Sequence, residues 1–126
     1  MARILVIEDV EEVRDVIRRT LEAEGYEVVE ASDGKEGIKL YREKQADLII
    51  TDIIMPDKEG IETIKELRQD FPDMKIIAIS GGGRIGPFDY LNLAKQFGAS
   101  RTLAKPFELK ELVKIVRELL ESHEGS

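Results

Sequence analysis

Short apolar runs alternate with amphipathic segments along the whole chain, and this alternation constrains the fold more than any other feature. Each apolar run has the length of a strand. Each intervening segment repeats its apolar residues three or four positions apart, as on one face of a helix. The pattern predicts five strands, at 3–7, 26–31, 47–51, 75–80 and 101–104, and five helices, at 10–25, 33–44, 60–71, 87–98 and 108–123.

Strands of this kind indicate a parallel sheet that helices cover on both faces, because most of the runs do not alternate between apolar and polar residues. Right-handed crossovers between successive strands then give a doubly wound α/β fold. A chain of 126 residues is sufficient for one such domain. In doubly wound sheets the functional residues gather at the carboxyl ends of the strands, so a site is expected there.

Charge and composition exclude several classes of protein. The 26 acidic residues outnumber the 19 basic ones and give a net charge of -7, which argues against direct binding to nucleic acid. The cysteine count of 0 excludes disulfides and thiolate metal sites. The beginning of the chain resembles neither a signal peptide nor a membrane span. These features predict a soluble, cytoplasmic protein that does not insert into a membrane.

Polar residues stand at the ends of four of the five expected strands. The first strand ends in Glu8 and Asp9, and the third reaches Asp52. Ser80 ends the fourth and is followed by three glycines, beginning with Gly81, and Lys105 follows the fifth. Because the carboxyl ends of parallel strands meet at one edge of a sheet, these residues are expected to lie together.

Three carboxylates at one edge repel one another, at a cost on the order of 4 kcal/mol for a pair 4 Å apart at an effective dielectric constant of 20. An all-oxygen set of this kind suits Mg²⁺, which commonly completes its shell with a phosphate. Lys105 can pair with that phosphate, and Ser80 and the amide of Gly81 can donate hydrogen bonds to it. Asp52 is then a candidate nucleophile, with its carboxylate expected to face solvent and metal.

In this order the motifs resemble the receiver (CheY-like) domain of two-component response regulators, and the resemblance covers essentially the whole chain. It implies a five-stranded parallel sheet in the flavodoxin-like order 2-1-3-4-5 with five helices. Residues 1–122 would form the receiver domain and residues 123–126 a disordered tail.

The resemblance also implies roles for the residues of the site. Asp52 would accept a phosphoryl group from a phosphohistidine on a histidine kinase or a histidine phosphotransfer protein. Asp9, Asp52 and the backbone carbonyl of Ile54 would bind Mg²⁺ directly, and Glu8 would bind it through water. Lys105, in a cis peptide with Pro106, would neutralise the phosphoryl group, and Ser80 would hydrogen-bond it.

The implied function is a phosphorylation-dependent signalling switch that changes partner binding, with catalysis limited to its own phosphorylation and dephosphorylation. The output would be a downstream protein or an output domain on a longer chain. Thr102 stands where many receivers carry an aromatic switch residue. The segment 87–98 is apolar on nearly every side, so Tyr90 and Leu91 are predicted to form a partner face or a homodimer face.

Two alternatives use the same residues. A Mg²⁺-dependent phosphatase of the haloacid dehalogenase type also places an aspartyl nucleophile after a strand, but it needs a second acid two residues later, where this chain has Ile54. A pseudo-receiver that acts only as a scaffold is the other alternative, and the intact set of acids argues against it.

Overall fold

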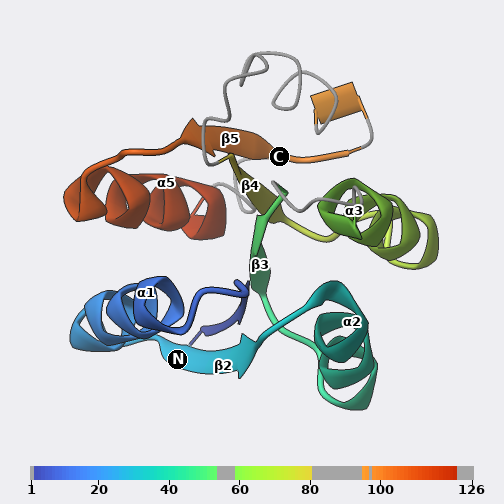
Figure 1. Ribbon diagram of the computed structural model, residues 1–126, viewed down its shortest axis with the longest axis horizontal. Coiled ribbons are helices and arrows are strands. Elements are labelled where there is room, and N and C mark those ends of the chain that lie inside the picture. Colours follow the sequence, from blue (N-terminus) through green and yellow to red (C-terminus); the bar gives the residue numbers. More distant parts are fainter. Residues whose placement is uncertain (1, 54–58, 81–94, 97, 122–126) are drawn as a thin grey trace.

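The computed structural model describes residues 2–53, 59–80, 95–96 and 98–121. Its centre is a five-stranded parallel sheet in the order β2-β1-β3-β4-β5, which confirms the predicted fold and strand order (Figure 1). The strands are β1 (Arg3–Ile7), β2 (Glu27–Ala31), β3 (Leu48–Asp52), β4 (Ile76–Ser80) and β5 (Arg101–Ala104), each within about one residue of its predicted bounds.

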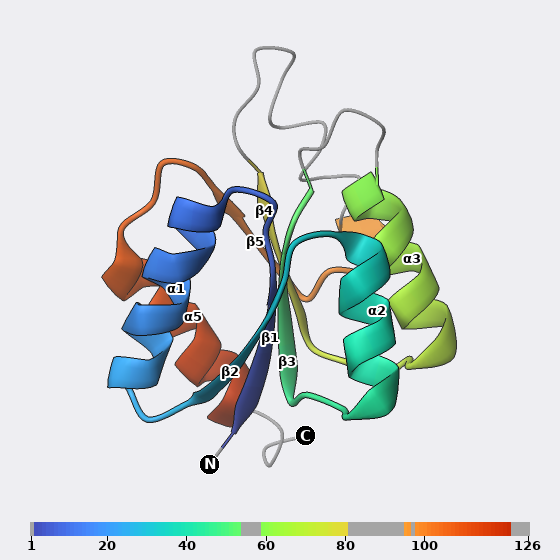
Figure 2. The same cartoon turned by 60° about the horizontal axis from the view of Figure 1, so that its bottom comes forward.

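Four helices lie within the described residues, and the sheet separates them into two pairs (Figures 1 and 2). They are α1 (Glu11–Ala23), α2 (Gly34–Glu43), α3 (Glu59–Asp70) and α5 (Leu109–Glu121). Of the helix predicted at 87–98, residues 95 and 96 are helical, and most of the remainder falls outside the described residues, as does the tail 123–126. None of the described helices is long and apolar enough to span a membrane.

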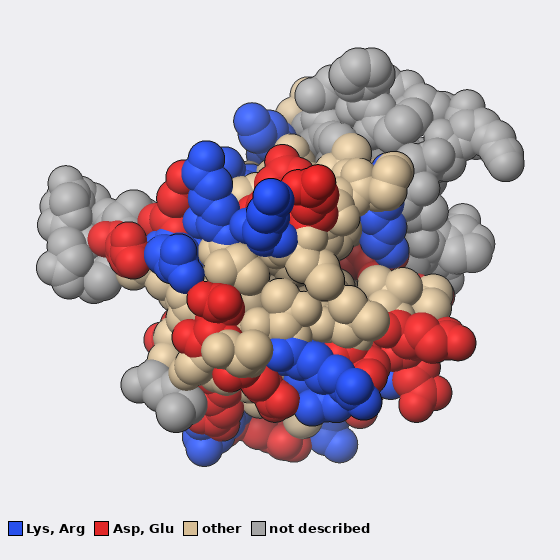
Figure 3. All heavy atoms as spheres, turned by 90° about the vertical axis from the view of Figure 1, so that its left-hand side faces the viewer, with Lys and Arg blue, Asp and Glu red and all other residues tan. Residues whose placement is uncertain are grey.

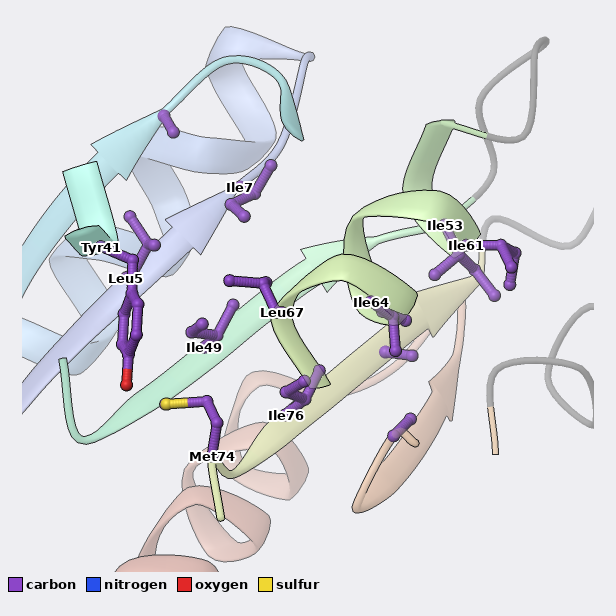
Figure 4. Packing of buried hydrophobic residues seen from close by; sticks show 13 residues of the cluster. Leu5, Ile7, Tyr41, Ile49, Ile53, Ile61, Ile64, Leu67, Met74 and Ile76 are labelled. Carbon is purple, nitrogen blue, oxygen red and sulfur yellow. The ribbon is translucent and has the colours of Figure 1, made fainter. Parts of the chain in front are cut away.

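The two faces of the sheet carry separate hydrophobic cores, because successive side chains of a strand point to opposite faces. Ile4 and Val6 of β1 pack beneath α1 and α5 with Ile17, Leu21 and Leu112. The other face packs against α2 and α3 (Figure 4), with a core that includes Leu5, Ile7, Tyr41, Ile49, Ile53, Ile64, Leu67, Met74 and Ile76. All residues of β3 and β4 are buried, so these two strands form a rigid centre for the residues at their ends.

Helix α2 approaches the sheet closely at Gly37. A Cβ at this position would lie 2.4 Å from the Cδ1 of Ile7, which is closer than real side chains pack. Glycine weakens a helix interior, but here it lets α2 lie against the end of β1. Asp33 caps the start of α2, and its carboxylate accepts a hydrogen bond from the backbone N–H of Glu36 at 2.8 Å. The close approach of α2 thus occurs at Ile7, the last residue of β1, which directly precedes Glu8.

Candidate functional site

The ends of the central strands bring the predicted residues to one edge of the sheet. The β1 ladder continues to Glu8, whose backbone N–H donates to the carbonyl of Ala31 at 3.0 Å. Asp52 is the last residue of β3, and it pairs with Ile79 of β4. The N–H of Lys105 donates to the carbonyl of Ser80 at 2.8 Å, and the Lys105–Pro106 peptide is cis, as predicted.

Lys105 bridges two of the acids. Its Nζ donates to Oδ2 of Asp52 at 3.0 Å and to Oε1 of Glu8 at 3.3 Å. Glu8 and Asp52 are only 1% and 5% exposed, respectively, so both ion pairs lie below the surface. The carboxylate of Asp52 is therefore buried against Lys105, and the expectation that it faces solvent is wrong.

Glu8, Asp9 and Asp52 form an acidic cluster that could hold a metal ion. One oxygen from each carboxylate lies within 4.8 Å of the others, and Asp9 is exposed whereas the other two acids are buried. Oxygen ligands with one open side match the preference of hard cations such as Mg²⁺. The chemistry of the donor set thus fits the expected metal.

Burial and charge shift the protonation equilibria at this edge. Desolvation, together with the neighbouring charge of Asp52, raises the pKa of Glu8 to about 7. Burial opposes the charge of Lys105, but the hydrogen bond and the charge of Asp52, assisted by Glu8, outweigh it and hold the pKa of the ammonium above its ordinary value. The ammonium of Lys105 therefore compensates the buried carboxylate of Glu8 only in part.

Ser80 has an unusual environment for a hydroxyl. Its side chain is fully buried, and among the described residues its Oγ has no hydrogen-bond partner. An unpartnered buried hydroxyl costs free energy, about 1–3 kcal/mol, and most native structures avoid it. A hydroxyl in this state is available to donate to an added oxygen ligand.

The remaining predicted residues are distributed differently. Thr102 lies in β5 opposite Ala78 of β4 and is half-buried. Ile54, Gly81, Tyr90 and Leu91 lie outside the described residues. The carbonyl expected to bind metal, the glycine amide and the predicted partner face therefore stay predictions.

Sequence reasoning missed one residue that contacts the site. Arg14 of α1 donates from Nη1 to the backbone carbonyl of Glu8 at 2.8 Å and from Nε to Oε1 of Glu30 at 3.3 Å. In the sequence it is one of several arginines on an amphipathic helix, and such residues usually point to solvent. The sequence separation of Arg14 and Glu8 does not predict their contact, because the contact depends on where the loop after β1 turns.

Comparison with known proteins is consistent with this arrangement. The family profile described as the response regulator receiver domain matches residues 4–117. The crystal structure of a CheY-like response regulator receiver domain protein from Methanospirillum hungatei JF-1 superposes with a TM-score of 0.89 at 29% identity, covering 99% of this chain and 98% of that one. A receiver domain from Clostridium thermocellum gives 0.88 at 31% identity, covering 98% of both chains.

Two curated relatives are longer proteins. The sensor kinase CckA of Brucella abortus is 35% identical over 125 residues, which are 98% of this chain and 13% of the kinase. The transcriptional regulatory protein CpxR of Escherichia coli K12 is 34% identical over 120 residues, which are 95% of this chain and 50% of the regulator. This chain thus spans half or less of the length of these relatives. Its sheet order and the profile match over residues 4–117 together show that the chain belongs to the response regulator receiver domain family, which acts in phosphorylation-dependent signalling.

Proposed function

We propose that Asp52 accepts a phosphoryl group from a phosphohistidine on a histidine kinase or a histidine phosphotransfer protein. The observation that carries this proposal is the position of Lys105, whose ammonium lies 3.0 Å from Asp52 and 3.3 Å from Glu8. A carboxylate is a sufficient nucleophile toward phosphorus when the charge of the phosphoryl oxygens is neutralised. The strand ends hold the nucleophile and the neutralising group together before any substrate binds.

In the transfer, an oxygen of Asp52 forms a bond to phosphorus while the phosphorus–nitrogen bond of the donor breaks. The imidazole nitrogen of the donor keeps the electron pair, and the donor leaves as neutral histidine because its other ring nitrogen carries a proton before the transfer. Lys105 stabilises the negative charge on the transferring oxygens, and the unpartnered hydroxyl of Ser80 donates a hydrogen bond to one of them. These two groups act by position and charge, and neither exchanges a proton with the substrate.

Asp9 and Asp52 would hold Mg²⁺ directly, and Glu8 would act at its periphery. When bound, the ion supplies positive charge to the carboxylates and to the phosphoryl oxygens. Lys105 pairs with Glu8 and Asp52, and a divalent cation would add further positive charge to this edge. The all-oxygen composition of the cluster supports Mg²⁺ over softer metals.

A protein donor needs a surface beside the site, and the described residues offer one along the first half of α1 and at the beginning of α5. Val10, Val16 and Leu109 are 43%, 46% and 37% exposed, respectively, although all three are large and apolar. Val16 and Leu109 line a shared groove with Val13 and Phe107. Figure 3 shows this side of the molecule, where an uncharged area lies between acidic and basic side chains. We place the donor on this face, since Val10 directly follows the acidic pair.

Phosphorylation would alter the partners of Lys105 and Ser80, because both gain phosphoryl oxygens to bind. These groups stand at the ends of neighbouring strands, β4 and β5, so their rearrangement favours one conformation of that edge. The outcome is a change in binding to a downstream protein, to an output domain or to a second copy of the chain. The proposal includes a cytoplasmic location for this signalling.

The test is the intact mass of the protein after incubation with acetyl phosphate and Mg²⁺. The wild type is expected to gain one phosphoryl group, and Asp52→Asn and a chelated sample are expected to gain none. Asp73→Asn is the matched control, because Asp73 is an exposed aspartate outside the acidic cluster.

Measurement of released phosphate separates the switch from a phosphatase. A receiver releases phosphate only as its own phosphorylated form decays, whereas rapid turnover of many equivalents would support the enzyme alternative. A protein that gains no mass from acetyl phosphate or from a phosphohistidine donor would contradict the proposed function. That result would support the alternative of a pseudo-receiver that acts only as a scaffold.

A further inference from the structure

The loop between β1 and α1 carries two of the three acids, yet the helix that follows lacks the usual anchor. The N-cap residue of α1 is Val10, and it makes no side-chain cap hydrogen bond. A capping Ser, Thr, Asp or Asn normally fixes the chain where it enters a helix. In this loop the backbone N–H of Val10 donates to Oε2 of Glu8 at 3.1 Å, whereas Asp9 is exposed.

Arg14 holds the same loop from inside the helix. Its Nη1 donates to the backbone carbonyl of Glu8 at 2.8 Å, and this carbonyl belongs to the peptide that joins Glu8 to Asp9. The N–H of Glu8 is held from the other side by Ala31 of β2 at 3.0 Å. The peptide units on either side of Glu8 are therefore both tethered, which fixes the direction in which the chain leaves β1.

Glu30 in turn holds Arg14. Oε1 of Glu30 accepts from Nε of Arg14 at 3.3 Å, and its other oxygen lies 3.3 Å from Nε of Arg18. The side chain of Arg14 is only 17% exposed. A guanidinium is planar and carries several donors in fixed directions, so bonding to Glu30 at one edge orients the donor that reaches Glu8.

We propose that Arg14 is a positioning residue for the metal site: through the carbonyl of Glu8 it sets the direction of Asp9, and Glu30 orients Arg14 for this task. The inference rests on the proposed function, because it assigns Arg14 a role in the binding of Mg²⁺. Arg14 touches neither the metal nor the phosphoryl group. Its action resembles that of the groups behind metal ligands in other proteins, whose loss weakens metal binding by about 10–100-fold.

The test is the affinity for Mg²⁺, measured by isothermal titration calorimetry, together with the Mg²⁺ dependence of phosphorylation by acetyl phosphate. Arg14→Gln is expected to raise the dissociation constant for Mg²⁺ about tenfold. The phosphorylation rate at saturating Mg²⁺ should return to the wild-type value, because Asp52 and Lys105 are unchanged. Arg14→Lys keeps the charge but not the two-sided geometry, so its affinity should lie between the two.

Arg18→Gln is the matched control. Arg18 lies one turn further along α1, also pairs with Glu30 at 3.3 Å and is half-buried, but its ion pairs are with Asp15, Glu22 and Glu30, away from the loop. This variant should bind Mg²⁺ like the wild type even if it loses similar stability. Glu30→Gln should weaken Mg²⁺ binding less than Arg14→Gln, because Arg14 keeps its bond to the carbonyl.

Wild-type affinity in Arg14→Gln, or an equal loss in Arg14→Gln and Arg18→Gln, would overturn the inference while the proposed function stands, provided that Asp9→Asn loses Mg²⁺. If Arg14→Gln does not fold, the Mg²⁺ affinities of Arg14→Lys and Glu30→Gln test the inference instead, again by comparison with Arg18→Gln. A wild type that neither binds Mg²⁺ nor gains phosphate would overturn the proposed function together with the inference.

Discussion

Ion pairs occur both at the carboxyl ends of the strands and on the exposed surface of the molecule, and the two groups differ in their effect on stability. Lys105 lies 3.0 Å from Asp52 at a site where Asp52 and Glu8 are almost fully buried. Arg101 and Glu118 also lie 3.0 Å apart, but their side chains are 43% and 47% exposed. Equal distances thus conceal unequal environments, and the environment decides the energetic consequence.

An exposed pair is screened by water and contributes about 0–1 kcal/mol. A buried pair has lost its hydration, so removal of one partner leaves an uncompensated charge and costs about 3–5 kcal/mol. The raised pKa of Glu8 shows that the buried group is also under-compensated. The comparison teaches that the carboxylates at the strand ends are buried although burial disfavours their ionised form. This arrangement is expected of a site that binds a cation and an anion.

The largest effect that tests this contrast is expected from Lys105→Met. Without the ammonium, the carboxylates of Asp52 and Glu8 are left facing each other, and the free energy of unfolding should fall by about 3 kcal/mol at pH 8 without divalent metal. Urea denaturation followed by circular dichroism measures this loss. The loss should shrink at pH 5, where Glu8 is protonated; equal losses at both pH values would show that the site is not limited by charge.

A smaller effect of opposite sign is expected from Glu8→Gln. Because the pKa of Glu8 is raised to about 7 in the folded protein, its contribution to stability is greatest below pH 4.5 and is lost as the pH rises through 7. The variant should therefore match the wild type at low pH and exceed its stability by about 2 kcal/mol at pH 8 without Mg²⁺. Denaturation curves from pH 4.5 to 8 provide the measurement, with the exposed Glu118→Gln as control.

Adding saturating Mg²⁺ tests the prediction for Glu8→Gln in a second way. The cation stabilises ionised Glu8 in the wild type, so the advantage of Glu8→Gln at pH 8 should shrink when Mg²⁺ is added. An advantage that is independent of both pH and Mg²⁺ would mean that the glutamine packs better for reasons unrelated to charge.

A charge added on the exposed apolar face should affect partners and leave folding unchanged. Val16→Asp is expected to slow transfer from a phosphohistidine donor protein about tenfold, equivalent to about 1.4 kcal/mol, because it places a carboxylate in the proposed contact. Phosphorylation by acetyl phosphate should proceed at the wild-type rate. Lys39→Asp adds negative charge to the exposed surface of α2 and serves as the control. Equal rates of phosphoryl transfer to Val16→Asp and Lys39→Asp would show that the donor does not bind this face.

The smallest effect is expected where the pair is exposed. Arg101→Gln breaks the ion pair with Glu118, and the free energy of unfolding should change by about 0.5 kcal/mol or less. The same denaturation assay measures it beside Lys105→Met. A loss as large as that of Lys105→Met would erase the distinction between the two groups of ion pairs.

Most of the fold could be predicted from the chain itself. The bounds of β1 and the end of β3 at Asp52 follow from the apolar runs, and the strand order follows from the resemblance to receiver domains. The structure confirms the order, and it confirms the bounds within about one residue. The reason for the glycine at position 37 could not be predicted from the sequence. Glycine lowers helix propensity locally, and only the distance to Ile7 explains why a helix tolerates it there.

The candidate site divides in the same way. The proximity of Glu8, Asp52 and Lys105 could be predicted from the sequence, because the carboxyl ends of parallel strands lie at one edge of the sheet. The burial of Asp52, the unpartnered hydroxyl of Ser80 and the contact of Arg14 with Glu8 could not be anticipated. Each depends on packing between segments that are far apart in the sequence or on the path of a loop.

The sequence by itself determined the architecture, the edge where the chemistry lies and the residue types that meet there, since periodicity and strand ends are local properties of a chain. The tertiary structure alone decided how those residues are charged and held. The pKa of Glu8, the bridge made by Lys105 and the position of Arg14 arise from distances and solvent exclusion that exist only once the sheet and its helices have assembled.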